Sequence, residues 1–143
     1  MDLKIRPSNR QDVDVVYQFM CELEECKLDQ TAFRAIFLHN LADPKIHYLV
    51  AEVEGAPVGF ISCHVQYLLH HTGKIAEIQE FYVRPEFRGR RIGRRLIEAT
   101  EERVRRENAV HLEVATNQRR TETVEFYKHV SFALSHFKLV KVL

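Results

Sequence analysis

The sequence reads Val83-Arg84-Pro85-Glu86-Phe87-Arg88-Gly89-Arg90-Arg91-Ile92-Gly93 at the point that decides its fold. This stretch joins a predicted strand, Ile75 to Val83, to an arginine-rich predicted helix, about Arg91 to Glu107. A strand, a basic glycine-containing turn and a helix together can hold a pyrophosphate. The reason is that unpaired N–H groups at a helix N-terminus point at the anion, and the helix dipole adds roughly half a positive charge there. Gly89 and Gly93 let the backbone approach such a ligand closely.

Hydrophobic periodicity and turn residues predict the elements on either side of this turn. In chain order they are a strand at Leu3 to Ile5, a helix from a Ser8/Gln11 capping box through Met20, a helix from Asp29 to Leu41, strands at His47–Val53, Val58–Leu68 and Ile75–Val83, the helix after the turn, a strand at Val110–Thr116, a helix at Thr121–Val130 and a last strand at Leu134–Val142. The order β-α-α-β-β-β-α-β-α-β predicts an α/β fold with a mixed sheet, antiparallel first and parallel later. We expect one domain, residues 1–143, because no linker or repeat interrupts the chain.

The strand before the turn changes phase. Ala76 and Ile78 place apolar side chains at even positions, whereas Phe81 and Val83 place them at odd positions. Because a strand has a period of two, this slip predicts one extra residue, a β-bulge, near Gln79-Glu80. If both faces of the strand were covered, the alternation would carry no such information.

The composition argues against several classes of protein. The formal net charge is +1, so no global field favours nucleic acid, and no apolar stretch approaches the roughly 18 residues of a membrane span. Glutamates interleave with the arginines of the predicted helix, which favours pairing within the helix over contact with nucleic acid. Three cysteines without metal-type spacing indicate free thiols, and hence a cytoplasmic protein.

The turn also matches a known signature, Gln/Arg-x-x-Gly-x-Gly/Ala. Arg88 and Gly93 match its ends, and Arg91 stands where glycine is usual. The stretch therefore resembles the acetyl-CoA signature of the GCN5-related N-acetyltransferase family. The resemblance implies acetyl-CoA as co-substrate, held by Phe81, Tyr82, Val83, Arg88, Gly89, Arg90, Arg91, Ile92, Gly93, Arg94 and Asn117.

A second part of the resemblance concerns proton transfer. Phe126-Tyr127, followed by Ser131-Phe132, resembles the family's fourth helix, which implies that Tyr127 protonates the departing thiolate. Ser131 replaces the usual glycine. An alkylamine has a pKa near 10, so attack at pH 7 requires removal of a proton at a cost of about 4 kcal/mol. Glu80, at the predicted bulge, is the best-placed candidate for the base, with Glu77 second, although either could only solvate the sheet edge. A backbone N–H freed at the bulge could polarise the thioester carbonyl.

Segments outside the turn resemble the aminoalkylphosphonate N-acetyltransferases. They are Cys21-Glu22-Leu23, Asp29-x-x-Ala32-Phe33-Arg34, Asn40-Leu41-x-Asp43-Pro44, Leu69-His70-His71, Glu77-Ile78-Gln79-Glu80, Thr116-Asn117 and Ser135-His136-Phe137. This resemblance implies acetyl transfer to the primary amine of a small aminoalkylphosphonate, with a divalent metal assisting. A phosphonate needs cations, and the predicted substrate-binding set is Glu77, His70, His71, Arg120 and His136. No fixed ligand spacing identifies the metal ligands.

Other readings stay open at this point. The acceptor could be another amine, such as a polyamine, an aminoglycoside or a protein N-terminus; an acidic pocket would favour the first two, whereas the histidines and arginines favour an anion. A non-catalytic module that binds acyl-CoA or nucleic acid is a further alternative, against which Tyr127 and Asn117 argue. Homodimers are common in the family, but nothing in the sequence identifies an interface.

Overall fold

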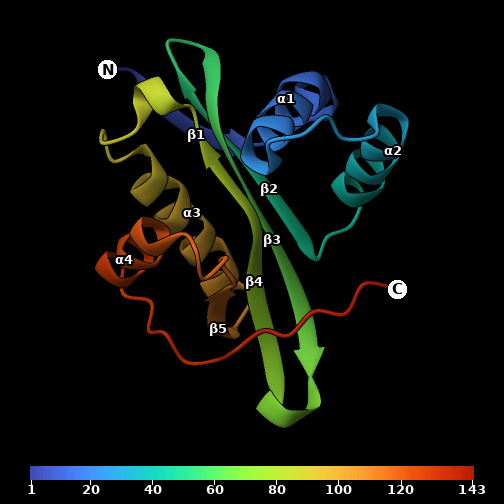
Figure 1. Ribbon diagram of the computed structural model, residues 1–143, viewed down its shortest axis with the longest axis vertical. Coiled ribbons are helices and arrows are strands. Elements are labelled where there is room, and N and C mark those ends of the chain that lie inside the picture. Colours follow the sequence, from blue (N-terminus) through green and yellow to red (C-terminus); the bar gives the residue numbers. More distant parts are fainter.

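The computed structural model describes residues 1–143 as a five-stranded sheet with two helices on each face (Figure 1). The strands lie in the order β1-β2-β3-β4-β5; the first three pairings are antiparallel, and β4 and β5 are parallel. Their bounds are β1 Leu3–Pro7, β2 Ile46–Val53, β3 Ala56–Leu68, β4 Gly73–Val83 and β5 Ala109–Val114, and the helices are α1 Val13–Glu24, α2 Gln30–Leu41, α3 Ile92–Arg106 and α4 Thr121–His129. The predicted α/β class is confirmed.

Alternate side chains of the strands supply two separate cores. Val50, Phe60 and Tyr82 pack on one face with Phe19 of α1 and Phe37 of α2. The opposite face packs against α3 and α4 through a set that includes Ile61, Ile78, Val83, Leu96, Ile97 and Tyr127. The period of two along each strand thus divides the sheet into an α1/α2 face and an α3/α4 face. No helix has both the length and the apolarity that a membrane crossing requires.

The predicted bulge is present in β4. Glu80 pairs with Ser62 and Ile78 pairs with Cys63, so Gln79 between them has no partner on β3. The parallel ladder to β5 ends near the same place, at the pair Ile78 and Val114. Beyond Ile78 the two strands separate, and the backbone of β4 has no ladder partner on that side. We call this separation the fork.

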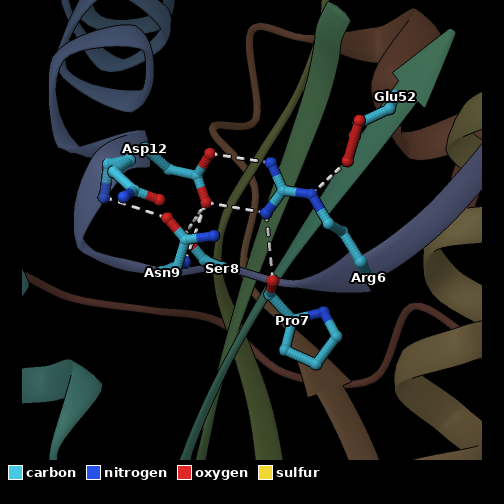
Figure 2. Close-up of polar contacts among 7 residues, drawn as sticks. Arg6, Pro7, Ser8, Asn9, Asp12 and Glu52 are labelled. Atoms are coloured by element: carbon cyan, nitrogen blue, oxygen red, sulfur yellow. Dashed lines mark hydrogen bonds and ion pairs between the residues drawn. The ribbon is translucent and has the colours of Figure 1, made fainter. Parts of the chain in front are cut away.

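A polar network at the start of α1 fixes that helix to the sheet (Figure 2). Arg6 of β1 donates from Nη1 and Nη2 to the Asp12 carboxylate, at 2.8 Å each, and from Nε to Glu52 of β2. Burial pushes the pKa of Asp12 upward, but hydrogen bonds from Arg6 and from the backbone N–H of Asn9 outweigh it and hold the pKa below its ordinary value. The helix cap involves Asn9 and Asp12 rather than the predicted Ser8 and Gln11.

One predicted element is absent. The strand expected at Leu134–Val142 does not form, and residues after Phe132 belong to no helix or strand. Phe137 and Leu139 are 97% and 92% exposed. The alternation of side chains favours a strand, but a strand forms only where a second strand satisfies its backbone, and this segment lies along none. The other predicted elements are present, with ends that differ by a few residues at most.

Candidate active site

The turn between β4 and α3 combines two left-handed residues with an open helix end. Gly89 has φ of 78° and Arg91 has φ of 65°. The left-handed conformation costs a residue with a Cβ roughly 1–2 kcal/mol, which explains why glycine is usual at the position that Arg91 occupies. Arg91 precedes α3, and no side chain caps the first N–H groups of that helix. Those donors therefore face the turn without a partner in the helix.

The arginines of this turn carry uncompensated charge. Arg105 and Arg106, near the end of α3, pair with Glu101 and Glu102, as the mixed charge pattern predicted. By contrast, the guanidinium groups near the start of the helix form no ion pair; they belong to Arg88, Arg90, Arg91, Arg94 and Arg95. All five residues are exposed, so the positive end of the helix dipole and these charges add at one place. This arrangement can bind a polyanion.

Gly93 allows α3 to approach β4 closely. A Cβ at this position would lie 3.0 Å from Cζ of Phe81 and 3.5 Å from Cζ of Phe126. Phe81, on the α3/α4 face of β4, stacks on Phe126 with ring centroids 5.8 Å apart. The glycine therefore sets the position of an aromatic group next to the fork.

Glu80 lies on the α1/α2 face of β4 and is held by Ser62. Its backbone N–H donates to Ser62 Oγ at 2.9 Å, and the same hydroxyl donates to a carboxylate oxygen of Glu80. Ser62 is fully buried. Nearby, Asn40 Nδ2 donates to the hydroxyl of Tyr48 at 2.7 Å. Burial raises the pKa of Tyr48, the Asn40 hydrogen bond opposes this, and the Glu80 carboxylate adds to it. Glu80 is thus a carboxylate with a fixed orientation, beside the bulge.

Tyr127 lies across the fork from Glu80, on the α3/α4 face. Its ring is 7% exposed and packs against Phe81 and Phe132, with ring centroids 6.2 Å and 5.5 Å away. Burial raises the pKa of Tyr127 to about 12, against an opposing effect of the Arg120 charge. The hydroxyl makes no hydrogen bond within the chain, yet no buried polar atom lacks a partner, so solvent reaches it. Tyr127 is therefore a protonated, accessible donor at neutral pH.

The loop before α4 closes toward α1. Asn117 is exposed, and its Oδ1 accepts the N–H of Arg119 at 2.9 Å. Arg120 donates from Nη2 to the carbonyl oxygen of Leu23, at the end of α1, at 3.3 Å. In the same part of α1, Glu22 accepts a hydrogen bond from the hydroxyl of Tyr82. Arg120 therefore lies close both to Tyr127 and to the end of α1, which packs on the other face of the sheet.

Two of the predicted substrate residues lie elsewhere. His70 and His71 follow β3 at the far end of the β3–β4 hairpin, and the seven residue-to-residue steps from Gly73 to Glu80 span about 23 Å of strand. His70 and His71, which we expected to bind substrate, therefore lie far from Glu80 because the hairpin is long. Glu77 lies opposite His64 and accepts a hydrogen bond from Gln79 at 2.8 Å.

His136 lies in the exposed C-terminal part of the chain, and its Nδ1 is hydrogen-bonded to the Ser135 hydroxyl at 2.6 Å.

Sequence reasoning missed several polar residues of this site. Ser62, Tyr48 and Asn40 surround Glu80 from β3, β2 and α2. Their involvement depends on the strand register, which the bulge shifts by one residue. Two signals were available in the sequence: Asn40 belongs to a segment that resembles the aminoalkylphosphonate N-acetyltransferases, and Ser62 is a polar residue in the otherwise apolar run Gly59 to Cys63.

Comparisons with known proteins agree with this geometry. The sequence model of the acetyltransferase (GNAT) family matches residues 13–132. The chain is 41% identical over 140 residues to aminoalkylphosphonate N-acetyltransferase from Salmonella typhimurium, across 98% of this chain and 91% of that protein. It is 30% identical over 114 residues to thialysine N-epsilon-acetyltransferase from Sus scrofa, across 73% of this chain and 65% of that protein.

Solved structures share the fold at low sequence identity. A transcriptional regulator from Bacillus halodurans C-125 superposes with a TM-score of 0.92 at 19% identity, over 99% of this chain and all of that one. An aminoglycoside N-acetyltransferase in complex with CoA gives 0.89 at 16% identity, over 99% of this chain and 95% of that one. At these identities the likeness establishes the fold alone.

Proposed function

The chain belongs to the acetyltransferase (GNAT) family and transfers acetyl groups to amines, and from this premise we propose that acetyl-CoA is the donor and a small aminoalkylphosphonate the acceptor. The observation that carries the donor assignment is the uncapped start of α3 among five unpaired arginines. Similarity along 98% of the chain to an aminoalkylphosphonate N-acetyltransferase supports the acceptor assignment, because it includes segments far from the turn.

The residues at the turn fit a pyrophosphate. The N–H groups at the start of α3 supply donors, and the guanidinium groups of Arg88, Arg90 and Arg91 supply charge-assisted hydrogen bonds. No atom lies within 4 Å of the place where a Cβ on Gly89 would be, so the backbone there is open to a ligand. Acetyl-CoA bound here would supply a thioester carbonyl and a thiolate leaving group.

Glu80 and Tyr127 divide the proton transfers between the two faces of the sheet. Glu80, oriented by Ser62, takes the proton of the acceptor amine on the α1/α2 face. Tyr127, protonated because burial raises its pKa to about 12, delivers a proton to the leaving sulfur from the α3/α4 face. The fork between β4 and β5 is the opening through which both residues reach one thioester. Because Ser62 engages the N–H of Glu80, the donor that polarises the carbonyl must be another N–H of β4 beyond Ile78.

Arg120 is the cation best placed to bind a phosphonate. It lies near enough to Tyr127 to influence its pKa, and it reaches the end of α1, whose Glu22 contacts Tyr82 on the α1/α2 face. Its exposed guanidinium keeps donors free for an anion. A metal has no matching donor set here: the one group of three side chains with converging ligand atoms is His71, His111 and Glu113. That group lies at the far end of the hairpin, so we derive no step through a metal.

The test follows thiol release from acetyl-CoA with aminoalkylphosphonates, polyamines and aminoglycosides as acceptors. We expect turnover with the phosphonates, and a KM for phosphonate that rises roughly 10-fold or more in Arg120→Gln, since hydrogen bonds to a charged group contribute about 1.5–3 kcal/mol. Arg119→Gln is the matched control, because the exposed Arg119 side chain forms no hydrogen bond or ion pair. Turnover of another amine but not of phosphonates would refute the acceptor while leaving the acetyl transfer intact.

A further inference from the structure

Three side chains near the tip of the β3–β4 hairpin bring their ligand atoms together. His71 ends the short turn Leu69–His71 that precedes β4, and His111 and Glu113 belong to β5. One ligand atom from each of the three lies within 4.8 Å of the other two. Glu113 Oε2 is 3.8 Å from His111 Nδ1 and 3.9 Å from His71 Nε2. In Figure 1 the hairpin extends past the helices, and all three side chains keep some access to solvent.

The fold brings these side chains to one face of the sheet. His111 and Glu113 are two residues apart on β5, and residues at this spacing point to the same side of a strand. Leu112 between them packs into the α3/α4 core, so both polar side chains point away from α3 and α4. Thr72 has φ of 49°, and this left-handed residue reverses the chain directly after His71. The turn thereby brings the His71 ring to the β5 pair.

The separations between the ligand atoms suit a transition-metal ion. Zinc binds histidine nitrogen and carboxylate oxygen at about 2.0–2.2 Å, so two atoms bound to one tetrahedral ion are about 3.3–3.5 Å apart. The carboxylate of Glu113 and the two histidine nitrogens would have to approach by only about 0.5 Å. Two imidazole nitrogens and one carboxylate oxygen suit zinc, cobalt or nickel, whereas magnesium and calcium prefer oxygen ligands alone.

Direct hydrogen bonding does not explain the group. At 3.8 and 3.9 Å the contacts of Glu113 with the two histidines are too long for hydrogen bonds, whereas His47 and Glu107 approach to 2.9 Å. The rings of His71 and His111 lie 5.0 Å apart and contact the same carboxylate oxygen, so two charged rings would repel each other. A metal ion instead uses the lone pairs of two neutral rings and the charge of the carboxylate together.

We propose that His71, His111 and Glu113 bind one divalent ion of the zinc class, with water at the fourth position. The ion would link the tip of the hairpin to the edge strand β5. Only the five residues from Lys74 to Ile78 of β4 pair with β5, and the fork lies at one end of this short ladder. The ion would hold the two strands together at the other end.

This ion takes no part in the proposed acetyl transfer. Glu113 lies opposite Glu77, on the hairpin side of Gln79, whereas Glu80 lies beyond that bulge. It is therefore distinct from the substrate-assisting metal that the resemblance to aminoalkylphosphonate N-acetyltransferases implies. Its role is to stabilise the fold, and metal binding by itself reports on it.

The test titrates the full chain, freed of metal with a chelator and then dialysed, with zinc chloride in a calorimeter. We expect one zinc ion per chain and a melting temperature that rises with zinc, because a ligand of the folded state stabilises it. Cobalt(II) should bind at the same site and give the strong visible absorption of a four-coordinate ion.

Single substitutions test the three ligands. His111→Gln and Glu113→Gln should each raise the Kd for zinc about 100-fold or more, since losing a group that merely orients a ligand already costs about 10–100-fold. Both residues retain access to solvent, so folding should be kept, as circular dichroism would verify. His70→Gln is the matched control: its ring lies 4.2 Å from that of His71, yet it does not belong to the converging group. This variant should keep the affinity of the unaltered chain.

Four results would overturn the proposal. The first is an unaltered chain that binds no zinc at a ratio of one to one. The second is an affinity that His111→Gln and Glu113→Gln leave unchanged, which would place the ion elsewhere, for instance at the cysteines. The third is an equal loss of affinity in His70→Gln, which would indicate binding by the histidine pair of the turn alone. The fourth is a melting temperature that zinc does not raise. None of these readouts depends on acetyl transfer.

Discussion

Replacing Gly93 by alanine has two opposing effects on stability. The added Cβ crowds Phe81, whereas alanine has a higher helix propensity than glycine. The new Cβ would lie 3.0 Å from Cζ of Phe81, whereas carbon atoms at optimal separation are about 3.5–4.0 Å apart. The ring must therefore move by about 0.5 Å or more. Overpacking of this kind costs about 1–3 kcal/mol, and alanine in a helix returns at most about 1 kcal/mol. The net loss in the free energy of unfolding should be about 0–2 kcal/mol.

The substitution should also affect catalysis, to a degree comparable with this loss of stability. Phe81 contacts both Phe126 and Tyr127, so its displacement moves the groups that flank the fork. Misplacement of reacting groups by 1 Å can cost about 100-fold in rate, so a shift of half that size should lower kcat/KM for acetyl-CoA on the order of 10-fold. Urea denaturation measures the first quantity, and thiol release with varied acetyl-CoA measures the second.

Gly55→Ala supplies the control. Gly55 has φ of 80° in the β2–β3 turn, and a Cβ there meets no atom within 4 Å. Alanine should cost about 1–2 kcal/mol by the backbone alone and leave kcat/KM unchanged. If Gly93→Ala instead raises the melting temperature and keeps kcat/KM, then Phe81 does not hold the donor site in place, and the reasoning is refuted.

Three further changes test other parts of the site and the fold. Tyr127→Phe should reduce kcat at least 10-fold and leave acetyl-CoA binding, measured by calorimetry, within about twofold; equal turnover would remove its role as the acid. Ser62→Ala leaves the N–H of Glu80 without a partner, so urea unfolding should show that the free energy of unfolding falls by about 1–3 kcal/mol. The same change should lower kcat at constant KM for acetyl-CoA, and an unchanged kcat would argue against a role of Ser62 in positioning Glu80. Because the pKa of Asp12 is lower in the folded chain than its ordinary value of 3.8, the stability it contributes is present above that pH and is lost as the pH falls toward the folded pKa. Asp12→Asn should flatten the decline in urea stability below pH 4, and an equally steep decline would contradict the network of Figure 2.

Two predicted features depend only on residues that are close together in the sequence, and both are present in the structure. The change of phase at Gln79-Glu80 is visible in four apolar residues, Ala76, Ile78, Phe81 and Val83, and the structure has the bulge there. The turn at Gly89 was expected from its glycine, and Gly89 is left-handed, as is Arg91 at the position where glycine is usual. Ser131, the other departure from a usual glycine, also has a positive φ, of 75°. In each case the determinant is local, so the sequence alone indicates it.

Features that depend on distant partners could not be predicted in the same way. His70 and His71 are close to Glu80 in sequence, but an extended hairpin converts that separation into about 23 Å. Ser62 meets Glu80 only because one residue of β4 is left unpaired. Residues Leu134 to Val142 have the side-chain pattern of a strand, yet pairing needs a second strand, and they pair with none of the five strands of the sheet. The side-chain pattern of a segment therefore indicates which secondary structure it can form. Whether that structure forms depends on the packing and hydrogen-bonding partners that the rest of the molecule supplies.

The fork also has a mechanical consequence. Past Ile78 and Val114 no backbone ladder joins the two arms of the sheet, and α4 is held to β4 through aromatic contacts of Phe81 with Phe126 and Tyr127. Aromatic contacts yield more readily than a hydrogen-bonded ladder, so the arm that carries α4 belongs to the part of the molecule that opens at low free energy. A ligand lying in the fork would bridge both arms and stiffen them together. If acetyl-CoA binds in the fork as proposed, we expect its binding to restrict the movement of the two arms relative to each other.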